Sequence, residues 1–216
     1  MRDAVWAIVG LLSGGRAFVL AQRDVVRFRA TGETFGSGRA TEFNGLSFAV
    51  ALTSAILWWQ AAQHFEHNIT ILSTGLLIAA GLRLLLIDID THLLPSGIVY
   101  RTIALAVPLL LIAALNDSTG SVGGMVLGAL IMWCVMKVLE VLSRGDLGGG
   151  DVTASLLLGL YLGWHSLESV LTALVFAFAS AGLFALFLLA LRRAGRRTHI
   201  AFGPFLIAGT LFAVLR

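Results

Sequence analysis

Charged residues are scarce in this chain. Asp, Glu, Lys and Arg make up 12% of its 216 residues, against roughly 25% in an ordinary soluble domain. Hydrophobic residues make up 58%, and the mean hydropathy is +0.91. This composition excludes a soluble globular protein, a disordered tail and a fibrous repeat. It is typical of a membrane protein.

Cysteine is scarcer still. The single cysteine, Cys134, lies inside an apolar run, which excludes intramolecular disulfides and cysteine-rich zinc sites. We expect it to be a small buried core residue, because a free cysteine usually packs as a hydrophobe. His64 and His67 have the spacing of a metal-binding pair, but no third protein ligand is evident. We therefore expect no metal site.

Basic residues outnumber acidic ones, 15 to 12. In a membrane protein such an excess mostly reports topology, so we expect no nucleic-acid partner. The arginines of residues 192–197 are candidates to contact the headgroups of membrane lipid.

Apolar runs separated by polar breaks predict about eight transmembrane helices, and hence an all-α polytopic membrane protein. The predicted spans are residues 4–21, 45–63, 69–88, 97–115, 121–142, 151–164, 166–191 and 199–215. No small-residue cleavage pattern follows the first, so we expect a span and not a removable signal peptide. These spans leave no room for a soluble domain. We therefore expect one integral-membrane domain over residues 1–216, with residues 22–44 as a short cytoplasmic connection.

The distribution of arginine and lysine predicts the orientation of these spans. Every basic residue except Arg2 and Arg216 lies in or beside an odd-numbered connection between spans. Cytoplasmic loops of membrane proteins carry the excess of positive charge. The odd connections are therefore predicted to be cytoplasmic, with both termini on the outer face.

Glycines recur at four-residue spacing in two of the predicted spans. Gly120, Gly124 and Gly128 follow this spacing in the fifth span, and Gly159 and Gly163 in the sixth. Small residues at this spacing allow the backbones of two helices to approach closely in lipid. The pattern predicts tight helix packing.

Aspartates near the ends of spans are the main candidates for chemistry. Asp88 and Asp90 close the third span and Asp151 opens the sixth, and the predicted topology puts these ends at the cytoplasmic face. Charged groups at membrane level are costly and mark function by default. Two carboxyl groups at one level can share a proton, activate water and protonate a carbonyl oxygen, as in an aspartic protease.

The glycines before Asp151 fit this chemistry. Gly148, Gly149 and Gly150 form a predicted flexible hinge where a substrate backbone can approach, because glycine has no side chain. Taken alone, the GGGD motif is more typical of a helix start with Asp151 as N-cap.

Three other polar residues have simpler interpretations. Lys137 and Glu140 are three residues apart in the fifth span, which predicts a local ion pair. His92 follows the third span and is interpreted as a polar helix-end residue.

Three motifs together, DIDTHLLP at residues 88–95, GGGD at 148–151 and FGPF at 202–205, resemble the type IV prepilin peptidase family, membrane aspartic proteases with a GxGD signature. The resemblance extends from about residue 70 to the C-terminus. The positions that match are Asp88, Leu94, Pro95, Gly148, Gly150, Asp151, Gly159, Leu162, Gly163, Trp164, Phe202, Gly203, Pro204 and Phe205.

The resemblance implies that Asp88 and Asp151 are the catalytic pair of an endopeptidase. Its substrates would be prepilin or pseudopilin precursors with a short basic leader, cut commonly after a glycine at the cytoplasmic face of a prokaryotic inner membrane. Asp90 and Asp146 are candidates to bind such a leader. Hydrolysis would need no cofactor.

The chain departs from the family pattern in several places, of which two bear on activity. Long-type members carry two CxxC pairs that bind zinc in the first connection, whereas residues 22–44 contain no cysteine. Thr153 stands where the family commonly has Lys. The reduced connection leaves N-methylation, and with it the use of S-adenosylmethionine, open.

Two other functions remain as alternatives. An inactive peptidase-like scaffold of a pilus or secretion system would retain the same motifs. An ion-coupled transporter would use the aspartates to bind a cation, but predicts carboxylates near mid-membrane and an inverted repeat. The sequence does not indicate the oligomeric state.

Overall fold

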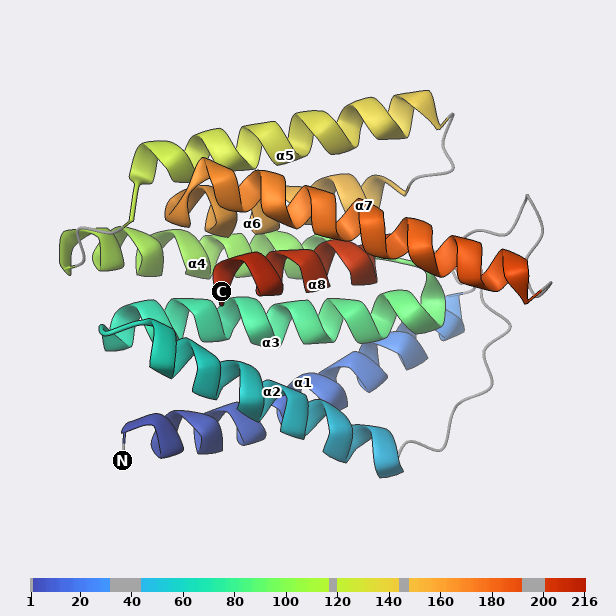
Figure 1. The fold of residues 1–216 in the computed structure, drawn as a ribbon. Helices are drawn as coiled ribbons and strands as arrows, with labels where there is room; N and C mark the ends of the chain where they lie inside the picture. The colour runs from blue at the N-terminus through green and yellow to red at the C-terminus, as the bar shows by residue number, and fades with distance from the viewer. Residues whose placement is uncertain (1, 32–43, 117–119, 144–147, 192–200) are drawn as a thin grey trace. The chain divides into compact units, whose positions relative to one another are not determined.

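The computed structural model describes residues 2–31, 44–116, 120–143, 148–191 and 201–216. In these ranges it contains helices and no strand (Figure 1). The helices are α1 (Arg2–Thr31), α2 (Asn44–His64), α3 (Asn68–Thr91), α4 (Ser96–Asn116), α5 (Val122–Leu142), α6 (Gly149–His165), α7 (Leu167–Ala190) and α8 (Gly203–Val214). Each corresponds to one predicted span, so the all-α fold is confirmed.

Helix α1 differs most from its predicted span. It continues as a helix to Thr31, whereas the apolar run ends at residue 21. The added segment pairs its charges with α3, through Asp24 with Arg83 and Arg29 with Asp90. The first part of the predicted 22–44 connection is therefore helical, and residues 32–43 lie outside the described ranges.

Five of these helices, α1, α3, α4, α5 and α7, are long and apolar enough to cross a membrane. Helix α6 has 17 residues and α8 has 12, and a full crossing takes about 20. Because five helices are long and apolar enough to cross, the protein is an integral membrane protein. Crossing by all eight helices, and outer termini, stay predictions.

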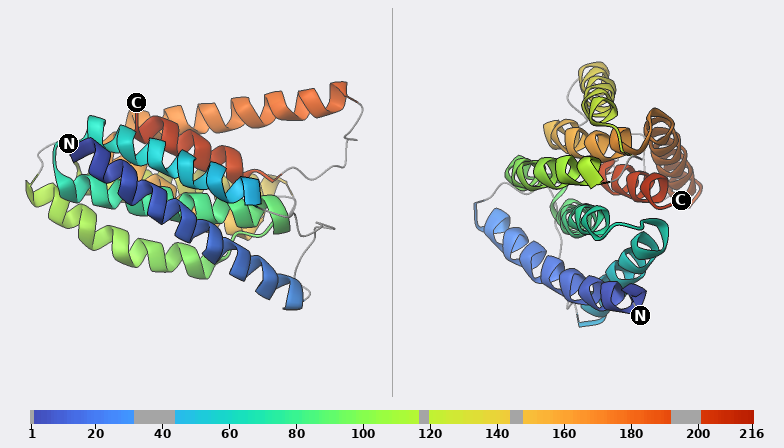
Figure 2. Two further views of the ribbon diagram at one scale, coloured as in Figure 1. Left: turned by 90° about the horizontal axis from the view of Figure 1, so that it is seen from below. Right: turned by 90° about the vertical axis from the view of Figure 1, so that its left-hand side faces the viewer.

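The chain divides into two compact units, residues 1–120 with 215–216, and residues 121–214. In the first unit successive helices run antiparallel (Figure 1), and α1 lies obliquely across α3 (Figure 2). Close approach of α2 and α3 depends on Gly75, since a Cβ atom there would lie 2.0 Å from Trp58 Cζ2. The single-domain organisation stays a prediction.

The second unit contains α5 to α8, again with successive helices antiparallel (Figure 1). Helices α5 and α6 pack glycine against glycine, and a Cβ atom on Gly128 would lie 2.5 Å from the Gly159 carbonyl oxygen. The tight packing predicted from glycine spacing is confirmed. The FGPF motif joins α8 to α7, because the Phe202 and Phe205 rings lie 5.1 and 5.5 Å from the rings of Phe178 and Phe184.

The prediction that Cys134 is buried is wrong. Cys134 lies on the exposed side of α5, whereas Met132 and Met136 on the same helix are fully buried. A membrane helix is apolar on its lipid-facing side as well as on its packed side. Composition therefore identifies the span without indicating which face is packed.

Candidate functional site

Asp88 lies in the last turn of α3 and is buried, with 4% of its surface exposed. Its Oδ2 atom has no hydrogen-bond partner in the described part of the chain. Two other aspartates of this unit differ, since Asp24 and Asp90 each pair with an arginine. Burying an acidic group without a partner costs free energy, so such a group marks a functional site.

Two hydrogen bonds stabilise the end of α3, where Asp88 lies. The His92 N–H donates to the Asp88 carbonyl oxygen at 2.8 Å, and the Thr91 hydroxyl donates to the Ile87 carbonyl oxygen at 2.8 Å. His92 has a left-handed backbone with φ of 52°, a conformation that costs free energy for residues other than glycine. Pro95 then directly precedes α4. The DIDTHLLP motif thus forms the last turn of α3 and the connection to α4, and His92 is confirmed as a helix-end residue.

Asp90, two residues from Asp88, is bound to α1. Arg29 Nη2 lies 2.8 and 2.9 Å from its two carboxylate oxygens, and this pair is partly buried. Sequence reasoning missed Arg29, because no local spacing links residues so distant along the chain. Binding of a substrate leader by Asp90 stays a prediction.

This ion pair is expected to stabilise the Asp88-bearing end of α3. Arg29→Gln or Asp90→Asn should each lower the free energy of unfolding by about 1–3 kcal/mol, because a charged hydrogen bond is lost in a partly buried place. Thermal unfolding in detergent measures the loss. The exchanged pair, Arg29→Asp with Asp90→Arg, should recover part of it, and an exchange worse than both single variants would contradict the pairing.

Asp151 is the third residue of α6. The N-cap is Gly148, and the Asp151 N–H donates to the Gly148 carbonyl oxygen at 3.0 Å. The interpretation of Asp151 as N-cap is therefore wrong, and of the predicted hinge glycines Gly149 and Gly150 are helical. The free N–H groups of a first helical turn favour a carboxylate there.

Gly148, the glycine directly before α6, leaves its stretch of backbone accessible. Gly148 has an ordinary φ of −68°, and a Cβ atom there would meet nothing in its own unit closer than Asp151 Oδ2 at 3.7 Å. Neither backbone strain nor packing in this unit requires glycine. What the missing side chain provides is access to an exposed stretch of backbone.

The side chains of Glu140 and Thr153 lie near the start of α6. Glu140 Oε1 would lie 3.4 Å from a Cβ atom on Gly149, and Glu140 pairs with Lys137, so the predicted ion pair is confirmed. Thr153 donates its hydroxyl to the Gly149 carbonyl oxygen at 3.0 Å. Polar groups thus gather in the first turn that carries Asp151.

The described residues contain no group of three His, Cys, Asp or Glu side chains that could hold a metal ion. Asp146 and the arginines of residues 192–197 lie outside the described ranges.

Comparison with known proteins places these motifs in context. Residues 70–191, which contain both Asp88 and Asp151, match the type IV leader peptidase family. Curated relatives named prepilin leader peptidase/N-methyltransferase are 32% identical in Burkholderia pseudomallei over 63% of this chain, and 31% identical in Pseudomonas aeruginosa over 79%. A relative with the same name from Stutzerimonas stutzeri is 30% identical over 76%.

The aligned regions cover 44%, 57% and 55% of these three relatives, so the chain spans about half the length of the curated relatives it matches. No solved structure matches. The family match covers more than half of the chain and includes the DIDTHLLP and GGGD motifs. This chain therefore belongs to the type IV leader peptidase family.

Proposed function

We propose that this chain is a membrane aspartic endopeptidase that removes leader peptides from type IV prepilins or pseudopilin precursors. The observation that carries the proposal is the buried Asp88 carboxyl group, whose Oδ2 has no partner among the described residues. Membership of the leader peptidase family and the printed names of the relatives support the substrate class.

In the proposed reaction Asp88 and Asp151 share one proton. The ionised carboxylate removes a proton from a water molecule while the water oxygen attacks the scissile carbonyl carbon. The protonated carboxyl donates to the carbonyl oxygen. The C–N bond then breaks, and the leaving nitrogen takes a proton from the pair. Because the two groups titrate as a pair, neither is assigned a fixed role, and hydrolysis needs no cofactor.

We place this reaction at the cytoplasmic face of an inner membrane, with both termini outside. The arginine distribution supports this orientation. Asp88 lies in the last turn of α3 and Asp151 in the first turn of α6, so each is near a helix end and not at mid-span, where a transporter would need it. The missing side chain at Gly148 leaves space for a substrate backbone.

Co-expression with a prepilin in bacterial membranes tests this function. We expect a shorter pilin on gels, with the N-terminal mass of a cut after the leader glycine, and no cut in a precursor with that glycine replaced by valine. An added methyl group on the new N-terminus would show that N-methylation, with S-adenosylmethionine as donor, is retained. No cleavage by well-expressed protein would favour the scaffold alternative.

A further inference from the structure

A second feature of the first unit is a cavity lined by arginines. This cavity of about 280 Å³ opens among α1, α3 and α4. Each of these helices contributes one arginine to its lining, namely Arg16, Arg83 and Arg101. Most of the remaining lining is apolar and includes Leu20 and Leu105. The cavity thus combines positive charge with a hydrophobic wall.

Only one of the three arginines is neutralised. Arg83 donates from Nε and Nη2 to Asp24 Oδ2 at 2.9 and 2.6 Å. Arg16 and Arg101 make no ion pair or hydrogen bond in the part of the chain that the structure describes. Two positive charges therefore line this cavity without a paired anion among the described residues.

The position of the cavity near one end of α3 and α4 suits a lipid headgroup. Arg83 precedes the last residue of α3, Thr91, by eight residues, and Arg101 follows the first residue of α4, Ser96, by five. The two arginines therefore lie about 12 Å and about 7–8 Å along their helices from the turn between α3 and α4. Lone arginines inside an apolar layer are costly and extend toward the headgroup region. A guanidinium group matches the geometry of a phosphate group.

We propose that this cavity binds the phosphate of an anionic phospholipid. Arg16 and Arg101 hold the phosphate, and Leu20, Leu76 and Leu105 contact the start of the acyl chains. A free inorganic anion would use the arginines but not the apolar wall. This proposal concerns lipid binding and does not depend on the proposed peptidase activity.

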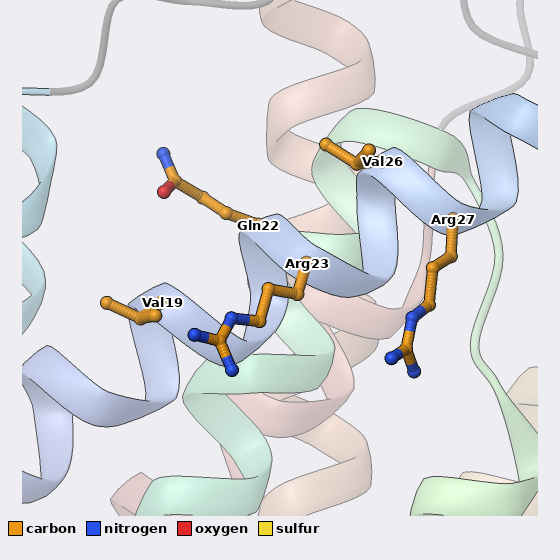
Figure 3. Close-up of a pocket in the computed structure, with 5 residues that line it drawn as sticks. All are labelled: Val19, Gln22, Arg23, Val26 and Arg27. Atoms are coloured by element: carbon orange, nitrogen blue, oxygen red, sulfur yellow. The ribbon is translucent and has the colours of Figure 1, made fainter.

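A second hollow on α1 provides a matched control. It is lined by Val19, Gln22, Arg23, Val26 and Arg27, all from one helix, and the Arg23 and Arg27 side chains extend to the same side (Figure 3). Among the described residues, no second helix contributes to this lining. These two arginines therefore report the general attraction of anionic lipid to a basic surface.

Binding of dioleoylphosphatidylglycerol and dioleoylphosphatidylcholine to the full chain in neutral detergent, measured by native mass spectrometry, tests the proposal. We expect preference for phosphatidylglycerol. Arg16→Gln with Arg101→Gln should weaken the affinity for this lipid by about fivefold per arginine, or about 25-fold together, because each substitution removes a hydrogen bond from a guanidinium group to the phosphate. Arg23→Gln with Arg27→Gln removes the same charge and should change it less than about twofold.

Three results would contradict the proposed lipid site. The first is equal affinity for both lipids, and the second is an equal loss of phosphatidylglycerol affinity in the two double variants. The third is loss of the lipid preference when inorganic phosphate is added at low millimolar concentration. If the glutamine variant unfolds, Arg16→Lys with Arg101→Lys keeps the charges and loses only the guanidinium geometry. It should retain phosphatidylglycerol preference with intermediate affinity, and loss of all preference there would contradict the charge-based site.

Discussion

Asp88→Asn is expected to reduce prepilin cleavage by about 10²–10⁴-fold, the contribution of general acid–base catalysis. The amide keeps the shape of the carboxyl group but cannot share its proton. Asp151→Asn should cause a loss of the same size. The double variant should be little worse than either, because residues that act as a unit are not additive. The ratio of cut to uncut precursor in isolated membranes, followed over time, measures these rates.

Asp90→Asn is the matched control, because it changes the same residue type on the same helix end. The Asp90 carboxylate pairs with Arg29. The loss of this ion pair should therefore lower the free energy of unfolding but have little effect on the rate of cleavage. Equal cleavage by Asp88→Asn and the native chain, at equal amounts in the membrane, would contradict the assignment. Loss of cleavage in Asp90→Asn alone would move the catalytic role to Asp90.

The second large effect is expected where α5 meets α6. A Cβ atom on Gly163 would lie 2.1 Å from the Gly124 carbonyl oxygen and 2.7 Å from the Gly128 Cα atom. Both contacts are with backbone, so the helices must separate to accept even one methyl group. Gly163→Ala should therefore destabilise the protein by about 1–3 kcal/mol. Thermal unfolding in detergent detects this as a lowered midpoint.

Gly182→Ala makes the same chemical change where a Cβ atom would meet nothing within 4 Å. Gly182 lies inside α7, so alanine there should be neutral or stabilising by about 0.5–1 kcal/mol, through its better helix propensity. Gly163→Ala should thus lower the midpoint of unfolding, whereas Gly182→Ala should leave it unchanged or raise it. Similar shifts for both would show that helix propensity, and not the contact of α5 with α6, governs these positions.

The sequence by itself determined the helices and the family. In lipid, the backbone N–H and C=O groups of a spanning segment must form their hydrogen bonds within the protein. Apolar runs long enough to span therefore predict helices from composition alone. The glycine spacing in α5 and α6 predicted tight helix packing, because small residues on one face of a helix allow the backbone of another helix to approach closely. Which helices pack against each other is shown by the structure. The DIDTHLLP and GGGD motifs are also local, and they indicated the family before any tertiary contact was known.

Only the tertiary structure decided the partners of individual side chains. The pairing of Arg29 with Asp90, the exposed position of Cys134 and the gathering of three arginines around one cavity all depend on how each helix is rotated about its axis. In lipid an apolar sequence does not determine that rotation, because packed and lipid-facing sides are equally hydrophobic. The pairing of Arg29 with Asp90 and the gathering of the three arginines are set by contacts between residues far apart in the chain, which hydropathy does not encode.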